Sequence, residues 1–277
     1  MHASDIVKAG AKLFALPKSY QELQTLQNNG NASSASIAQC LLSDPVLTSQ
    51  VLRVANSSLY GHAKKIDTVS RAVTLVGQEN IFNLVLASST IDKFSHNKMP
   101  TFDINQFWDH SIRTAVTAQT LAKRCNVLYT ESYFIAGLMH DIGTMVIAVT
   151  LPEIARALYL PLPADISQKH EVEFQSLGFT HADVGGELLE TWSLPAHLIE
   201  AVRYHHGPQL AKHSPLSAAL VQIACAYSNP QYIEAGLQVD AFSWEISRLD
   251  PDQMEDIIED ISDALTETVH ELTHRAA

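Results

Sequence analysis

The sequence predicts an all-α protein with two helical lobes, and three observations lead to this prediction. Apolar residues recur at spacings of three and four along most of the chain, as they do on the buried face of an amphipathic helix. Capping residues and proline stand where these segments begin, and glycine or proline stands where several end. Strand-like alternation is weak everywhere. A polar break at 95–100 separates an expected N-terminal helical bundle, residues 1–100, from an expected second helical lobe, residues 101–277.

The composition restricts the classes of function that fit this chain. Its 277 residues can bury a sizeable core, and 46% of them are hydrophobic and 17% charged, as in a compact globular protein. Lysine and arginine number 18 against 30 acids, and the resulting net charge of −12 disfavours nucleic-acid binding. Three scattered cysteines fit a reducing compartment, and the chain shows neither a signal-peptide pattern nor a run of 18 apolar residues. We therefore expect a cytoplasmic protein without nucleic-acid or membrane partners.

The first lobe has the pattern of several short helices in succession. One helix begins near Ser36, and Asp44-Pro45 resembles an N-cap followed by proline at the first helical position. A later helix ends at Gly77, and the next one starts almost at once. Two helices joined so tightly suggest a DNA-binding helix-turn-helix. The second of them has no cluster of lysine or arginine, however, which favours a plain corner between packed helices.

The second lobe places its histidines at marked points of the predicted helices. Asp103 resembles the start of a capping box, and Thr180 has the same spacing to an acid three residues later. A helix that Pro195 opens ends in two adjacent histidines, and an amphipathic helix after Asp250 follows near the end of the chain. In chain order these histidines are His110, His140, His181, His205 and His206.

Residues 134–147 form the most apolar stretch of the chain, and His140 and Asp141 are its polar pair. The pattern predicts one buried helix, with both polar residues among core positions. A carboxylate in such a place must be paired, hydrogen-bonded or bound to a metal, because its bare burial is costly or neutralises it. Asp141 is therefore a candidate site residue, although a hydrogen bond from His110 or His140 would satisfy it without a metal.

A second pattern, in the first lobe, carries a resemblance to a known family. The segment from Leu42 to Ser57 (LSDPVLTSQVLRVANS), followed by Tyr60-Gly61 and by Ser70 to Gly77, resembles the signature of the HDOD family. The resemblance extends over about residues 16–227. This family is an offshoot of the HD-domain metal-dependent phosphohydrolases, is related to the HD-GYP proteins and is found in bacterial signalling. The resemblance implies a second lobe built as an HD-domain-like helical bundle.

The resemblance also implies a metal centre in the second lobe. HD-domain proteins hold a divalent cation with a first histidine, the His-Asp pair and a late aspartate, and further histidines extend some sites to two metals or contact phosphate. Neutral imidazoles and a carboxylate suit iron, manganese, zinc or nickel, and the bound water would attack phosphorus. Asp141 is the expected catalytic residue. The expected metal ligands are His110, His140, Asp141, His181, His205 and His206.

Two departures from the family pattern weigh against hydrolysis. Cys225 stands where the late aspartate is expected, and we interpret it as a core residue, with a thiolate ligand for a softer metal as the alternative. Thr144 stands where active relatives often carry a lysine that neutralises phosphate. The Gly-Tyr-Pro motif of cyclic-di-GMP phosphodiesterases is also missing after His205-His206. We expect at most one of these two histidines to face the pocket, and His170 to face solvent.

Two functions from different classes fit these observations. The leading interpretation is a bacterial HDOD-type signalling module with a degenerate HD metal site, which binds other signalling proteins and does not catalyse. Its pocket would hold a metal, a nucleotide or another phosphate-containing small molecule, or nothing. The alternative is a metal-dependent phosphohydrolase that acts on a nucleotide or phosphate ester. Stoichiometric metal and phosphodiester turnover that Asp141→Ala abolishes would separate the two.

Overall fold

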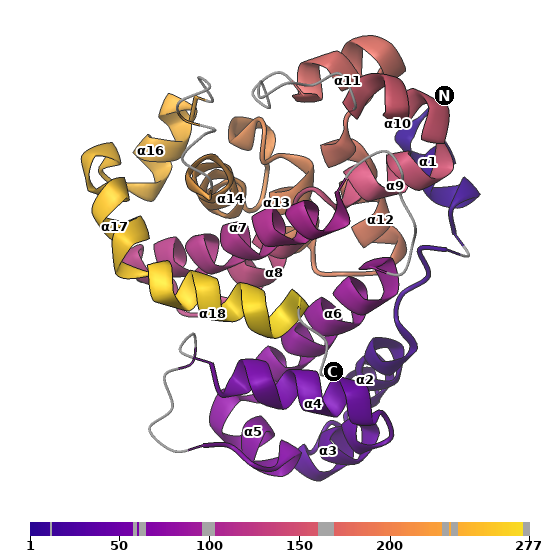
Figure 1. The fold of residues 1–277 in the computed structure, drawn as a ribbon, viewed down its shortest axis with the longest axis vertical. Coiled ribbons are helices and arrows are strands. Elements are labelled where there is room, and N and C mark those ends of the chain that lie inside the picture. Colours follow the sequence, from indigo (N-terminus) through magenta and orange to yellow (C-terminus); the bar gives the residue numbers. More distant parts are fainter. Residues whose placement is uncertain are drawn as a thin grey trace. The chain divides into compact units, whose positions relative to one another are not determined.

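The computed structural model describes residues 1–11, 13–57, 60, 65–95, 103–159, 169–228, 233 and 238–273. Within these ranges every regular element is a helix, which confirms the all-α prediction. The chain divides into two compact units. The smaller unit consists of Leu16–Lys98 and Ser262–Ala277, and the larger unit consists of Met1–Ala15 and Met99–Ile261. Figure 1 shows the elements of both, coloured along the sequence.

The smaller unit is built from short helices that pack on one long one. The long helix α6 contacts α2, α4, α5 and α18, and α3 contacts α2, α4 and α5. The helices of this unit are α2 (Lys18–Asn28), α3 (Ser34–Leu42), α4 (Pro45–Ala55), α5 (Val69–Val76), α6 (Gln78–Ser95) and α18 (Ser262–Thr273).

Local sequence signals set the ends of these helices. The side chain of Asp44 accepts a hydrogen bond from the backbone N–H of Leu47 at 3.0 Å, and Pro45 follows it at the first helical position of α4. Gly77 ends α5 with a φ of 92°, a conformation that residues with a Cβ rarely adopt. The predicted cap and the predicted glycine stop are therefore both present.

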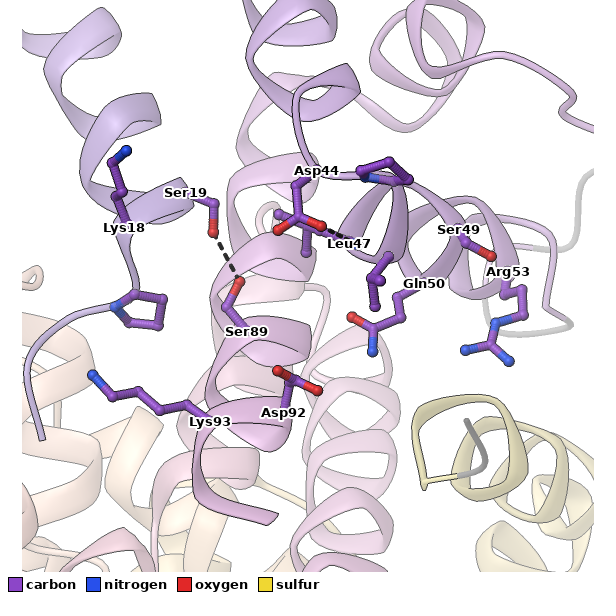
Figure 2. A pocket seen from close by; sticks show the side chains of 13 residues that line it. Lys18, Ser19, Asp44, Leu47, Ser49, Gln50, Arg53, Ser89, Asp92 and Lys93 are labelled. Carbon is purple, nitrogen blue, oxygen red and sulfur yellow. Dashed lines mark hydrogen bonds between the residues drawn. The ribbon is translucent and has the colours of Figure 1, made fainter. Parts of the chain in front are cut away.

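A groove of about 800 Å³ lies in the smaller unit, between α2, α4 and α6. Figure 2 shows Asp44 and Leu47 on one side of it, and the hydrogen bond of 3.1 Å that joins the hydroxyls of Ser19 and Ser89. Lys18, Lys93 and Arg53 bring positive charge to its lining. The complete lining is Pro17, Lys18, Ser19, Asp44, Pro45, Val46, Leu47, Ser49, Gln50, Arg53, Ser89, Asp92 and Lys93.

The larger unit carries the histidines. Its helix α7 packs along α8 and against α14, whereas α12 packs on α9, α13 and α1. The helices of this unit are α1 (Ala3–Ala9), α7 (Ile104–Arg124), α8 (Glu131–Met139), α9 (Ile142–Thr150), α10 (Pro152–Tyr159), α11 (Lys169–Leu177), α12 (His181–Thr191), α13 (Ala196–Arg203), η2 (Pro208–Leu210), α14 (Pro215–Tyr227), α16 (Ala241–Ser247), η3 (Pro251–Gln253) and α17 (Met254–Asp260).

The apolar stretch around His140 forms two helices, and the prediction of one helix was wrong. The helix α8 ends at Met139 and α9 begins at Ile142, so His140 and Asp141 form the turn between them. Each helix packs on a different partner, α8 on α7 and α9 on α12. Apolar periodicity could not show the break, because both segments are buried on nearly all sides.

Two glycines allow these partners to approach closely. A Cβ on Gly137 of α8 would lie 2.7 Å from the Cα of Ala115 in α7, well inside van der Waals contact. A Cβ on Gly143 of α9 would collide with the carbonyl oxygen of His181 and lie 2.7 Å from the backbone nitrogen of Gly185 in α12. The glycines on either side of His140-Asp141 therefore bring this turn close to the helices that carry the other histidines.

The division into units differs from the expected lobes at both ends of the chain. The boundary after Lys98 lies close to the expected one at residue 100, but Met1–Ala15 groups with the larger unit and Ser262–Ala277 with the smaller one. The helix α1 packs on α9 and α12, and the indole N–H of Trp192 donates to the carbonyl of Phe14 at 2.7 Å. The helix α18 packs on α4 and α6.

One stretch of the described chain, Glu131–Thr150, is long and apolar enough to cross a membrane by length and composition alone. It comprises α8 and α9, and 83% of its most apolar window is buried inside the protein. Helices of a protein core are buried to this extent, so the apolar composition of this stretch is accounted for by its place in the core.

Candidate metal centre

Five separate elements of the larger unit bring their side chains to one place. His110 lies on α7, and His140 and Asp141 form the turn between α8 and α9. His181 is the first residue of α12, which the expected capping box of Thr180 and Asp183 starts. His205 and His206 follow α13, and Cys225 lies on α14.

The imidazoles of His110 and His140 face each other through their Nε2 atoms, which lie 3.1 Å apart. The Nδ1 of His140 donates to the carbonyl oxygen of Gly137 at 2.6 Å. The Nδ1 of His110 donates to the hydroxyl of Ser228 at 2.8 Å, since that hydroxyl gives its own proton to the carbonyl of Cys225. Each neutral ring therefore turns the lone pair of its Nε2 toward the other.

His205 presents a third lone pair in the same way. Its Nδ1 donates to the carbonyl oxygen of Val202 at 2.7 Å, and its buried Nε2 has no hydrogen-bond partner among the described residues. The ring centroid lies 5.2 Å from that of His140. Burial lowers the pKa of His110 to about 3 and also lowers the pKa values of His140 and His205, so all three rings are neutral near pH 7.

Asp141 joins this group of rings to a lysine. Its Oδ2 accepts a hydrogen bond from Lys169 at 3.1 Å, and its Oδ1 lies 2.9 Å from Nε2 of His181 and 3.8 Å from Nε2 of His140. Burial alone would raise the pKa of Asp141, but the positive charges of Lys169 and His181 outweigh it and hold that pKa well below the usual range. Asp141 is therefore a carboxylate, partnered as its burial requires.

His181 lies between two carboxylates. Its Nδ1 lies 2.6 Å from Oε2 of Glu173, and Oε1 of Glu173 accepts from the hydroxyl of Tyr159 at 2.9 Å. Burial disfavours the charged ring, but Glu173 and Asp141 more than compensate and raise the pKa of His181 to about 9. Without a cation, His181 is thus protonated at neutral pH and bridges Asp141 and Glu173.

His206 completes the cluster on the side of His181. Its Nε2 lies 3.0 Å from Nε2 of His181, and its ring centroid lies 4.0 Å from that of His205. Its other neighbour is His170 of α11, which stacks on it with ring centroids 4.2 Å apart. Both rings of the His205-His206 pair thus face the cluster, and the expectation that at most one would was wrong. His170, which we expected to face solvent, is half-buried.

The structure brings all six predicted site residues together, and these residues and Cys225 form three groups whose donor atoms lie within 4.8 Å of one another. The first group combines two histidines with Cys225, whose Sγ lies 3.7 Å from Nε2 of His110. Cys225 therefore faces the site, which corrects its interpretation as a residue of the core alone. The groups are His110, His140 and Cys225; His181, His205 and His206; and His140, Asp141 and His205.

Three further residues of the site were not found in the sequence. Lys169 and Glu173 share one face of α11, and Ser228 follows α14. The spacing of four between Lys169 and Glu173 was the only available signal, and many solvent-exposed helices show it. Lys169 contacts Asp141, Glu173 contacts His181, and Ser228 contacts His110. These contacts arise from tertiary packing, which the sequence pattern does not show.

The donor distances fit a shared transition metal ion. Two nitrogens that bind one ion at about 2.0–2.1 Å each can be no more than about 4.2 Å apart. The 3.1 Å between His110 and His140 and the 3.8 Å between His140 and Asp141 both satisfy this limit. Lone pairs held this close repel each other unless a cation lies between them. The Nδ1–H bonds to Gly137, Val202 and Ser228 fix the rings as second-sphere partners of metal sites do.

The fold and this cluster define a class, an all-helical domain with a buried centre of imidazoles and one carboxylate contributed by separate helices. The family model of the HDOD domain matches residues 13–208. This match covers most of the chain, and the protein belongs to the HDOD family, as the signature around Asp44-Pro45 had indicated.

Two solved structures share this fold, and one further protein is similar in sequence. A candidate phosphohydrolase from Shewanella amazonensis is 25% identical with a TM-score of 0.76, over 97% of this chain and 98% of that one. An HDOD domain protein of unknown function from Geobacter sulfurreducens is 24% identical with a TM-score of 0.74, over 93% and 92% of the two chains. An uncharacterised protein from Treponema pallidum is 27% identical over 197 residues, which are 69% of this chain and 37% of that protein. The match thus spans little more than a third of that relative's length.

Proposed function

We propose that this protein is a regulatory module of bacterial signalling whose buried centre binds a divalent transition metal without hydrolysing a substrate. The observation that carries the metal is the set of neutral imidazoles around His140, whose Nε2 lies 3.1 Å from that of His110 and shares a second group of close donors with Asp141 and His205. Imidazole and carboxylate donors suit iron, manganese, zinc or nickel. His181 and His206 would extend the site toward a second ion.

The regulatory role is supported by what surrounds the donors. The side chains of Asp141 and Lys169 are each only 15% exposed, and that of His140 is fully buried, so a bulky phosphate ester has little access to them. The late aspartate of the HD pattern is replaced by Cys225.

A relative from Marinobacter aquaeolei with a TM-score of 0.72 and 22% identity is described as a candidate signal transduction protein. Protein partners and a cytoplasmic location belong to the same proposal.

A second candidate function, a metal-dependent phosphohydrolase, is favoured by Lys169. Its Nζ donates to the hydroxyl of Thr144 at 2.8 Å, so an ammonium lies beside the position where active relatives often carry their lysine. Lys169 of α11 therefore brings to Thr144 the positive charge that relatives carry at that position in their own sequence. In this role the metal would supply an activated water, and Lys169 would attract the phosphate group.

Elemental analysis and a turnover assay on protein purified without chelator test both functions. The regulatory module predicts stoichiometric metal that Asp141→Asn reduces, with no hydrolysis of bis(p-nitrophenyl) phosphate above the rate of the free metal ion. Turnover by the wild type that Asp141→Asn and Lys169→Met both abolish would establish the hydrolase instead. Protein that folds but binds no transition metal would refute both.

A further inference from the structure

The side chain of Cys225 is unlike the other two cysteine side chains. Its Sγ lies 3.7 Å from Nε2 of His110, whereas the thiol of Cys125 points to the carbonyl of Ser247 and that of Cys40 to Glu22. One turn of α14 holds both edges of the His110 ring, because Ser228 accepts from its Nδ1 and Cys225 faces its Nε2. The Nε2 lone pair of this ring thus faces both Nε2 of His140, at 3.1 Å, and the sulfur, at 3.7 Å.

The donor distances place this sulfur within reach of the same ion as the two imidazoles. A sulfur at about 2.3 Å and a nitrogen at about 2.0–2.1 Å from one ion can be no more than about 4.4 Å apart. The observed 3.7 Å satisfies this limit, and the donor atoms of His110, His140 and Cys225 all lie within 4.8 Å of one another.

An independent observation points to a ligand beside His140, the imidazole that shares a donor group with Cys225. His205 is 1% exposed, and its Nε2 finds no hydrogen-bond partner in the described part of the chain. It shares a potential donor group with His140 and Asp141. A buried acceptor left in this state is costly, and a cation between the rings would satisfy it.

We propose that Cys225 is a metal ligand, bound as a thiolate together with His110 and His140, and that it makes the site prefer softer ions to manganese. The step would be an exchange of one water of the hydrated ion for the sulfur, and that water leaves to the solvent. The S–H bond breaks, its proton passes to solvent water, and a metal–sulfur bond forms. Thiolate ligands favour zinc and the later transition metals, whereas an all-oxygen and nitrogen set accepts manganese more readily. This inference rests on the metal binding of the proposed function.

Cobalt(II) substitution tests the sulfur ligand without reference to activity. Metal-free wild type loaded with one equivalent of cobalt(II) should show the intense near-ultraviolet thiolate-to-metal charge-transfer band. Cys225→Ser should lose this band, and Cys40→Ser and Cys125→Ser, which remove the cysteines outside the centre, should keep it. Cys225→Asp, with the residue expected from the HD pattern, should bind cobalt(II) stoichiometrically without the band.

The outcomes separate this inference from the proposed function. Cobalt(II) bound by wild type without the band, or a band that survives in Cys225→Ser, would overturn the role of Cys225 and leave metal binding intact. Wild type that binds no cobalt(II) would overturn metal binding itself. A competition between zinc and manganese gives a second measurement, in which Cys225→Asp should reduce the preference for zinc at least about tenfold, since a thiolate is the softer donor. An unchanged preference would count against the thiolate.

Discussion

Asp141 is the residue on which the charge balance of the centre depends. It is the carboxylate that faces both the ammonium of Lys169 and the imidazolium of His181. Asp141→Ala would leave these two positive charges without that partner in a buried site, and we expect unfolding free energy to fall by about 3–5 kcal/mol. Urea denaturation of the metal-free protein measures the loss. As a control, Asp260→Ala removes a partner of Arg124 in a surface ion pair and should leave stability nearly unchanged. A variant of Asp141 that unfolds like wild type would contradict this role.

Glu173 controls the protonation of His181. The pKa of His181 is raised to about 9, so its contribution to stability is complete below its unfolded value of 6.5 and is lost as pH rises through about 9. We expect the metal-free wild type to lose stability over this range and Glu173→Gln to show a flatter dependence. Denaturant titrations between pH 6.5 and 9.5 measure the difference. Glu171→Gln, on the exposed side of the same helix, should retain the wild-type slope.

Residue types and family spacing predicted the histidines and Asp141, but they did not predict the partners of these side chains. His110, His140 and Asp141 stand in recognisable patterns, whereas Lys169 and Glu173 come from a helix without a motif. The side chain of Cys225 could not be assigned to the core or the site, because a small thiol on an apolar helix suits both. The tertiary packing of α11 brings Lys169 to Asp141, and that of α14 brings Cys225 to His110.

At the scale of elements, the turn between α8 and α9 depends on close helix contacts. Gly143→Ala would place a methyl group against the backbone of His181 and Gly185, which cannot move without shifting α12. We expect a loss of about 1–3 kcal/mol in unfolding free energy and a lower metal content, since overpacking displaces the histidine-bearing helix. Gly207→Ala is a suitable control, because its Cβ would meet side chains and no backbone, those of Leu210 at 3.3 Å and of Gln209 at 3.9 Å. Equal effects of the two substitutions would argue against this account.

Helix starts were easier to predict than the break in the apolar stretch. Asp44, Asp103 and Thr180 all cap helices with their side chains, as their spacing indicated. The break at His140-Asp141 had no such signal, since no proline interrupts 134–147 and Gly137 and Gly143 are compatible with a continuous helix. The break separates α8, which packs on α7, from α9, which packs on α12. The local sequence does not show which helices these two segments pack on.

For the whole molecule, metal binding should appear as added stability. A ligand that binds only the folded state stabilises it by about 4 kcal/mol at a free concentration one thousand times its dissociation constant. We therefore expect the melting temperature to rise when zinc is added to metal-free protein and to fall again with excess chelator. Differential scanning calorimetry measures both shifts. The combined variant His110→Ala and His140→Ala should show neither, and a full response in it would place the metal elsewhere.

The assignment of the chain ends to units was beyond what the sequence could show. The polar stretch near residue 100 indicated a boundary, and the division of the chain into units falls after Lys98. Composition marks where a compact region stops, but it does not say which distant segment packs on it. The apolar residues of α1 and of α18 pack on helices far away in sequence.

The assignment of Ser262–Ala277 to the smaller unit has a consequence for protein synthesis. Leu265, Thr268 and Leu272 of α18 are buried, and the helix packs on α4 and α6. Translation proceeds from the N-terminus, so α4 and α6 are synthesised before 99–261, and α18 is synthesised after it. Until α18 emerges, the apolar surface that it covers is open to water or to a chaperone. The smaller unit can therefore acquire its final packing only after the histidine-bearing unit has been translated.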